Sequence, residues 1–130
     1  MPKRAEPVIA ASSPDDEDPF AAVLEGQPYV IREWRGSGPA VLHVHDADDE
    51  AWQVLEGVLR FRFVDRLVDV PAGSIVLVPA GVPHTYEAIS ARYRVALTPR
   101  LEALIAELQR TRDPAAQRDI YTKYRSRVLD

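Results

Sequence analysis

The feature of this chain that most limits its fold is a close succession of short strand-like segments between Tyr29 and Leu97, separated by turns rich in glycine and proline. The expected strands span residues 29–34, 40–45, 51–55, 58–64, 67–70, 74–78, 85–89 and 91–97. Many short strands at regular spacing, with turn signals between them, are typical of an antiparallel sandwich or barrel. The sequence therefore predicts an all-β core that begins near residue 20 and ends at residue 99.

The two ends of the chain differ from this core. Residues 1–19 combine prolines with the acidic run at 15–18 and hold few bulky apolar groups, so we expect a flexible tail. The alternative is that this tail packs across the barrel or a partner subunit. Residues 100–130 predict two α-helices. Leu101, Leu104, Ile105 and Leu108 form one apolar stripe, and a second helix begins at Asp113-Pro114 and runs through Val128. We expect these helices to cover a sheet or form a subunit contact. A lid over a site is the alternative.

Composition excludes several classes of protein. The 130 residues contain no cysteine, which removes disulfide scaffolds, thiolate metal sites and cysteine nucleophiles, and fits a cytoplasmic protein. The net charge is −4 and no segment concentrates basic residues, so no nucleic-acid partner is expected. The longest apolar run, residues 75–80, is too short to cross a bilayer, and no membrane partner is expected.

All three histidines of the chain lie in two short segments. His43 and His45 are two residues apart, so on a strand their side chains leave the same face. Glu50 follows a short acidic loop, and His84 follows a Pro-Ala-Gly-Val-Pro turn. This nitrogen and oxygen set suits one divalent ion of iron, manganese, nickel, copper, cobalt or zinc, and in a six-coordinate metal it leaves two open positions.

The acidic loop offers rival ligands. Asp48 and Asp49 could each replace Glu50, because a loop can present any of these carboxylates. Glu50 is favoured because it opens a strand-like run. We interpret Asp46, Asp48 and Asp49 as a solvated turn.

These residues make the chain resemble the cupins. The first cupin motif, G-x5-H-x-H-x3,4-E-x6-G, is matched by His43, His45, Glu50 and Gly57, although Gly38 precedes His43 by one residue fewer than the motif asks. The second motif, G-x5-P-x-G-x2-H-x3-N, is matched by four residues, and Ala88 replaces its final Asn. The matching residues are Gly73, Pro79, Gly81 and His84. The resemblance covers about residues 29–99. It implies a double-stranded β-helix (jelly-roll) barrel over residues 20–99 with metal ligation by His43, His45, Glu50 and His84.

Strand alternation predicts which side chains line a pocket beside these ligands. The predicted pocket residues are Val41, Trp52, Val54, Tyr86, Tyr93, Val95 and Leu97. A mostly apolar pocket with a metal at one end suits a small organic ligand that carries a metal-binding oxygen. The alternative is that the aromatic residues only fill the core. The arginines that alternate with the apolar residues are expected to face solvent. They are Arg60, Arg62, Arg92 and Arg94.

The resemblance implies a mononuclear metal-dependent oxygenase of a small phenolic or enolic molecule, similar to quercetin-dioxygenase-like cupins. In this hypothesis Glu50 is both a ligand and a proton acceptor, and Tyr86 is a second catalytic residue. Two alternatives stay open: a non-oxidative isomerase, lyase or cyclase, and a non-catalytic binding protein. Open sheet edges and apolar helix stripes further predict a homodimer.

Overall fold

The structure is a computed structural model that describes residues 21–25 and 29–130. The predicted tail at residues 1–19 lies outside these residues. In chain order the described elements are β1 Ala21–Glu25, β2 Val30–Trp34, β3 His43–His45, β4 Glu50–Arg62, β5 Leu67–Pro71, β6 Ile75–Val78, β7 Thr85–Leu97, α1 Pro99–Leu108, α2 Pro114–Lys123 and β8 Ser126–Val128.

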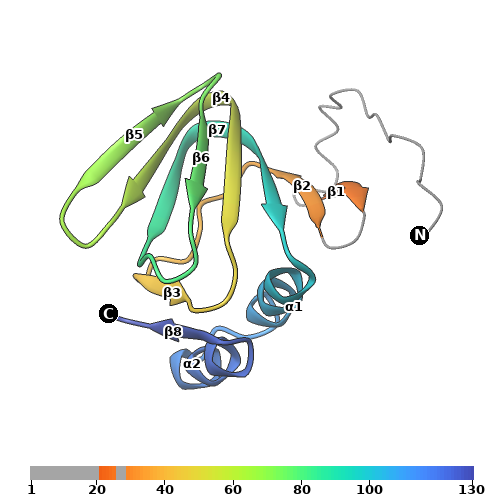
Figure 1. The fold of residues 1–130 in the computed structure, drawn as a ribbon, viewed down its shortest axis with the longest axis vertical. Coiled ribbons are helices and arrows are strands. Elements are labelled where there is room, and N and C mark those ends of the chain that lie inside the picture. Colours follow the sequence, from red (N-terminus) through yellow and green to blue (C-terminus); the bar gives the residue numbers. More distant parts are fainter. Residues whose placement is uncertain (1–20, 26–28) are drawn as a thin grey trace, which may run out of the picture.

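The strands form one large and one small antiparallel sheet. The large sheet has the order β1-β2-β7-β4-β5, and β6 pairs with the first part of β4 while β5 pairs with its last part. The small sheet pairs β3 with β8. The helices α1 and α2 lie together at one end of the sheets, next to β3 and β8 (Figure 1). The fold is therefore mostly β with two C-terminal helices, and within the described residues the sheets do not close.

Each of the two longest strands, β4 and β7, covers two strands that the sequence predicts as separate. The sequence predicts a turn at Glu56-Gly57 and separate strands on either side of it, but β4 continues through this point with two shifts in its register against β7. Gly57 has a positive φ of 69°, and a Cβ there would lie 2.1 Å from the Ser90 carbonyl oxygen of β7. Glycine is needed because the two backbones approach each other closely at this point, and the chain bends without reversing. Similarly, β7 runs unbroken through Ser90, which also has a positive φ.

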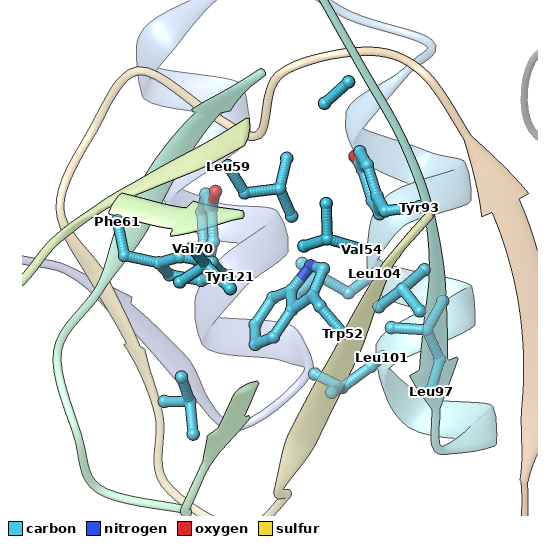
Figure 2. Packing of buried hydrophobic residues seen from close by; sticks show 13 residues of the cluster. Trp52, Val54, Leu59, Phe61, Val70, Tyr93, Leu97, Leu101, Leu104 and Tyr121 are labelled. Atoms are coloured by element: carbon cyan, nitrogen blue, oxygen red, sulfur yellow. The ribbon is translucent and has the colours of Figure 1, made fainter. Parts of the chain in front are cut away.

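The core lies on one face of the large sheet and extends into the helices. Trp52 of β4 is in the middle of the cluster and packs edge-on against Phe61, with ring centroids 4.9 Å apart (Figure 2). Leu101 and Leu104 of α1 and Tyr121 of α2 belong to the same cluster. The apolar stripe of α1 is therefore used inside the subunit. No helix of the described residues is long and apolar enough to span a membrane.

The second helix is shorter than predicted. The sequence pattern continues it through Val128, but α2 ends at Lys123, and Arg125 adopts a positive φ of 55° that reverses the chain. The next residues form β8, which pairs with β3, and the Asp130 carboxylate accepts a hydrogen bond of 2.6 Å from the backbone N–H of Leu42. Pairing with a distant strand thus outweighs the local helical pattern.

The prediction for the arginines is wrong for two of the four. The side chains of Arg92 and Arg94 are only 12% and 22% exposed, because Glu33 of the neighbouring strand β2 lies within 3.4 Å and 3.3 Å of them. Arg60 and Arg62 are more open to solvent. They nevertheless pair with carboxylates, such as Asp69, 2.7 Å from Arg60.

Candidate metal centre

Three imidazoles converge in the interior of the protein. His43, His45 and His84 are each buried, and one ring nitrogen of each lies within 4.8 Å of those of the other two. Local backbone pairing brings them together: the His43 N–H donates to the His84 carbonyl, and the His84 N–H donates to the His43 carbonyl, at 3.1 Å and 2.8 Å. The Gly81 N–H donates to the His45 carbonyl at 2.8 Å, so the turn before His84 is tied to the same strand.

Hydrogen bonds at Nδ1 orient all three rings. The His43 and His84 Nδ1 atoms lie 3.0 Å and 2.9 Å from the carbonyl oxygens of Val41 and Val82, which can only accept. The His45 Nδ1 atom lies 2.8 Å from Ser126 Oγ, whose own proton is donated to the Tyr124 carbonyl. Each Nδ1 therefore carries the proton, and each Nε2 presents a lone pair, which is the tautomer that a metal ligand requires.

Glu50, the first residue of β4, completes the donor set. Its Oε1 lies 3.3 Å from His45 Nε2 and 3.4 Å from His84 Nε2. Burial, reinforced by the neighbouring His84 and His45, lowers the pKa of His43 to about 3.

Neutral imidazoles and an ionised carboxylate are the protonation states in which these groups bind a metal. His84 Nε2 is buried with no hydrogen-bond partner in the described part of the chain. Bare lone pairs and a carboxylate oxygen that face one another at this spacing repel unless a cation lies between them. The residues therefore fit one divalent transition metal.

The three aspartates of the acidic loop are engaged elsewhere. Asp46 pairs with Arg127 of β8 at 3.0 Å, Asp48 is buried beside Arg100 at 3.3 Å, and Asp49 accepts from the Ala80 N–H at 2.8 Å. The prediction of a solvated turn is wrong for Asp48, because α1 covers the loop at that point. These contacts tie the loop before Glu50 to β8, to α1 and to the turn before His84.

The candidate metal centre lies at a cavity of about 330 Å³. The cavity is lined by Trp34, Ser37, Gly38, Pro39, Ala40, Val41, His43, His45, Glu50, His84, Tyr86, Val95, Leu101, Leu104, Ile105, Leu108, Gln109, Gln117 and Tyr121. Apart from the ligands, most of these side chains are apolar. Of the predicted pocket residues, Val41, Tyr86 and Val95 are therefore on the wall.

The other four predicted pocket residues lie in the hydrophobic core. They are Trp52, Val54, Tyr93 and Leu97. The Trp52 ring packs against the rings of His84 and Tyr86, with centroid distances of 5.7 Å and 5.5 Å. His84 and Tyr86 line the cavity, and Trp52 packs behind them in the core. Strand alternation identifies the inner face of a sheet, but it does not show which inner residues are covered by others.

The helices supply the part of the wall that the sequence prediction missed. Leu101, Leu104, Ile105 and Leu108 of α1 and Gln117 and Tyr121 of α2 all line the cavity. The apolar stripe of α1 was the available signal, since such a stripe must face an apolar surface. The contact of Ser126 with His45 had no signal in the sequence, because it depends on the pairing of β8 with β3.

Tyr86 belongs to a chain of two phenols. The Tyr93 hydroxyl donates to the Gly36 carbonyl at 2.7 Å, and the Tyr86 and Tyr93 oxygens are 2.7 Å apart. Because Tyr93 has only one proton and gives it to Gly36, Tyr86 is the donor in the second bond. Burial raises the pKa of Tyr86, so the phenol stays protonated. Tyr86 therefore offers the cavity lone pairs and no proton.

The fold is mostly β, and three imidazoles and a carboxylate meet at an interior cavity. These features define a β protein whose site could hold a single metal ion. The family model of the Cupin domain, Cupin_2, matches residues 30–98. The chain belongs to the cupin family.

Solved structures agree on the fold. A cupin-2 domain containing protein from Shewanella frigidimarina is 26% identical, with a TM-score of 0.54, over 61% of this chain and 78% of that one. A protein with a double-stranded β-helix domain from Klebsiella pneumoniae is 21% identical, with a TM-score of 0.52, over 68% and 78%. KdgF from Halomonas is 17% identical, with a TM-score of 0.52, over 65% and 85%. No curated protein matches the chain.

Proposed function

We propose that this cupin is a mononuclear metal-dependent oxygenase of a small phenolic or enolic molecule, in the manner of quercetin-dioxygenase-like cupins. The observation that carries the proposal is the position of the four ligands at a largely apolar cavity. The family match supports the double-stranded β-helix as the frame on which the two motifs bring these ligands together.

The donor set would be His43, His45, His84 and Glu50, with iron, manganese, nickel, copper, cobalt or zinc as the ion. When bound, the metal supplies Lewis-acid polarisation of a substrate oxygen. The protein itself binds the apolar body of the substrate against α1 and keeps water out. At about 330 Å³ the cavity is near the small end of ligand pockets, so it suits a molecule built around one ring.

Glu50 is the proposed proton acceptor. Its carboxylate is buried, with Oε1 3.3 Å from His45 Nε2, and as a metal ligand it would be ionised. Such a carboxylate can take the proton of a substrate hydroxyl at an Oε atom. Tyr86 contributes a hydrogen-bond acceptor to the same cavity.

The same carboxylate favours a second candidate function. Non-oxidative isomerases, lyases and cyclases also use a general base next to a Lewis-acidic metal ion, and such enzymes do not consume oxygen. A binding protein that uses the metal only as an anchor for its ligand would need neither step.

Metal identity and oxygen uptake separate these functions. We expect about one transition-metal ion per chain in protein purified after metal-replete expression, and its loss in a His43→Ala/His84→Ala double variant, measured by elemental analysis. Oxygen uptake is then measured with catechols, enols and β-dicarbonyls on iron-, manganese-, nickel- and copper-loaded protein. Uptake with any of them supports the oxygenase. Zinc alone, with no uptake, favours the non-oxidative or binding function.

A further inference from the structure

Besides the candidate ligand His84, a second residue that lines the cavity has a buried polar atom without a partner among the described residues. Tyr121 of α2 is only 2% exposed, and its hydroxyl is buried with no hydrogen-bond partner among the residues that the structure describes. A buried hydroxyl without a partner is destabilising, so native proteins keep few of them. Tyr121 lies outside both cupin motifs, on the helix that follows the matched residues.

Tyr121 is next to the metal centre. It lines the cavity, and its ring centroid is 5.4 Å from that of His43. A phenol carries its proton at neutral pH. The hydroxyl is therefore a hydrogen-bond donor close to the proposed ligands.

Three other polar side chains on the wall, those of Tyr86, Gln117 and Ser37, each make a hydrogen bond within the protein. The Tyr86 proton goes to Tyr93, and the Gln117 amide donates to the Thr111 carbonyl at 2.9 Å. Ser37 Oγ accepts from the Ala88 N–H at 2.8 Å. Next to the metal centre, Tyr121 thus offers a free proton and Tyr86 offers lone pairs.

We propose that Tyr121 donates a hydrogen bond to a deprotonated oxygen of the substrate, while Tyr86 accepts one from a neutral hydroxyl of the same molecule. This inference rests on the proposed function, and it narrows the substrate to a hydroxy-substituted phenolate or enolate, a monoanion with both kinds of oxygen. Tyr121 is then a substrate-binding residue, and α2 is part of the substrate site.

The test compares Tyr121→Phe with Tyr29→Phe, a control that removes an exposed hydroxyl. The probe is 4-nitrocatechol, titrated by absorbance into nickel-loaded protein. We expect Tyr121→Phe to keep its nickel and to bind the probe about tenfold more weakly or worse, as for the loss of a hydrogen bond to a charged group. Without the probe, its melting temperature should be unchanged or higher, because an unpartnered hydroxyl has gone. Tyr29→Phe should match the wild type.

Two results overturn the inference alone. One is wild-type affinity for the probe in nickel-loaded Tyr121→Phe. The other is a lowered melting temperature in the probe-free variant, which would show that the hydroxyl has a structural partner, such as a buried water. A wild-type protein that takes up no nickel, or takes it up and does not bind the probe, overturns the proposed function and the inference together.

Discussion

The orientation of the candidate ligands depends on three single hydrogen bonds at Nδ1. Two of the acceptors are backbone carbonyls, those of Val41 and Val82, which no substitution removes directly. The third is the side chain of Ser126, so His45 is the ligand whose orientation a single substitution can release.

We expect Ser126→Ala to weaken metal binding by about 10- to 100-fold, the usual effect of losing a group that orients a ligand. The overall fold should persist, because the β8 backbone still pairs with β3. Metal affinity is measured by competition with a chromophoric chelator. Ser74→Ala, in the turn before β6, is the matched control and should bind metal like the wild type. Equal affinity in the two variants would contradict an orienting role for Ser126.

The phenol pair gives a second prediction at this scale. Tyr86→Phe removes the donor to the Tyr93 oxygen, and we expect the free energy of unfolding to fall by about 1 kcal/mol. Metal content should not change, since Tyr86 is not among the four proposed ligands. If the protein is an oxygenase, turnover should fall. Urea unfolding, elemental analysis and oxygen uptake measure the three quantities, and metal loss in this variant would place Tyr86 in the metal centre itself.

At the scale of elements, the sequence predicts what is local. Alternation, turn residues and motif spacing place the strands that carry His43, His45 and Glu50 close to their positions in the structure. These local patterns fail where the structure of a segment depends on pairing with residues that are distant in the sequence. The sequence of Ser126–Val128 has a helical pattern, but these residues form a strand because they pair with the free edge of β3. Gly57 is a residue typical of turns, but here it lies within β4, where its lack of a side chain allows the close approach of Ser90. The helix contribution to the cavity had a local signal in the apolar stripe of α1, but the sequence does not show which surface this stripe faces.

The packing of α1 against the core and the cavity can be tested by measuring the free energy of unfolding. Leu104 is fully buried in the core and also lines the cavity. We expect Leu104→Ala to lower the free energy of unfolding by about 2–5 kcal/mol, because the truncation loses buried surface and leaves a void. Val64→Ala, at an exposed position, should change it by no more than about 0.5 kcal/mol. Urea unfolding of both variants gives the comparison. A small effect at Leu104 would mean that α1 is not docked.

The anchor of β8 predicts a dependence on pH. The Asp130 carboxylate accepts hydrogen bonds from the Leu42 N–H and from Arg62, and both lower its pKa. A lowered pKa in the folded state stabilises the protein above the ordinary pKa of aspartate, and this stabilisation is lost as the pH falls through the lowered value. The melting temperature of Asp130→Asn should therefore be below that of the wild type at about pH 7, and the two should converge towards about pH 3. A constant difference at every pH would argue against the anchor.

At the scale of the whole molecule, the helices that were candidates for a subunit contact are used inside the chain. Leu101, Leu104 and Tyr121 belong to the core, so the apolar stripes no longer argue for a dimer. The remaining argument comes from the sheet. Within the described residues β6 pairs only with β4, which leaves its other edge open, and two of its side chains, Ile75 and Leu77, are 69% and 61% exposed.

Open edges with exposed apolar side chains are usually covered in native proteins. We therefore still expect a homodimer, now through β6, with a mass in light scattering of twice the 14.5 kDa of the chain across the micromolar range. Ile75→Lys/Leu77→Lys should shift the protein to a monomer, because two charges would be buried at the contact. Val64→Lys changes an equally exposed residue outside the strand, and this control should stay dimeric. A wild-type mass of 14.5 kDa throughout would remove the dimer. A double variant that stays dimeric would move the contact away from β6.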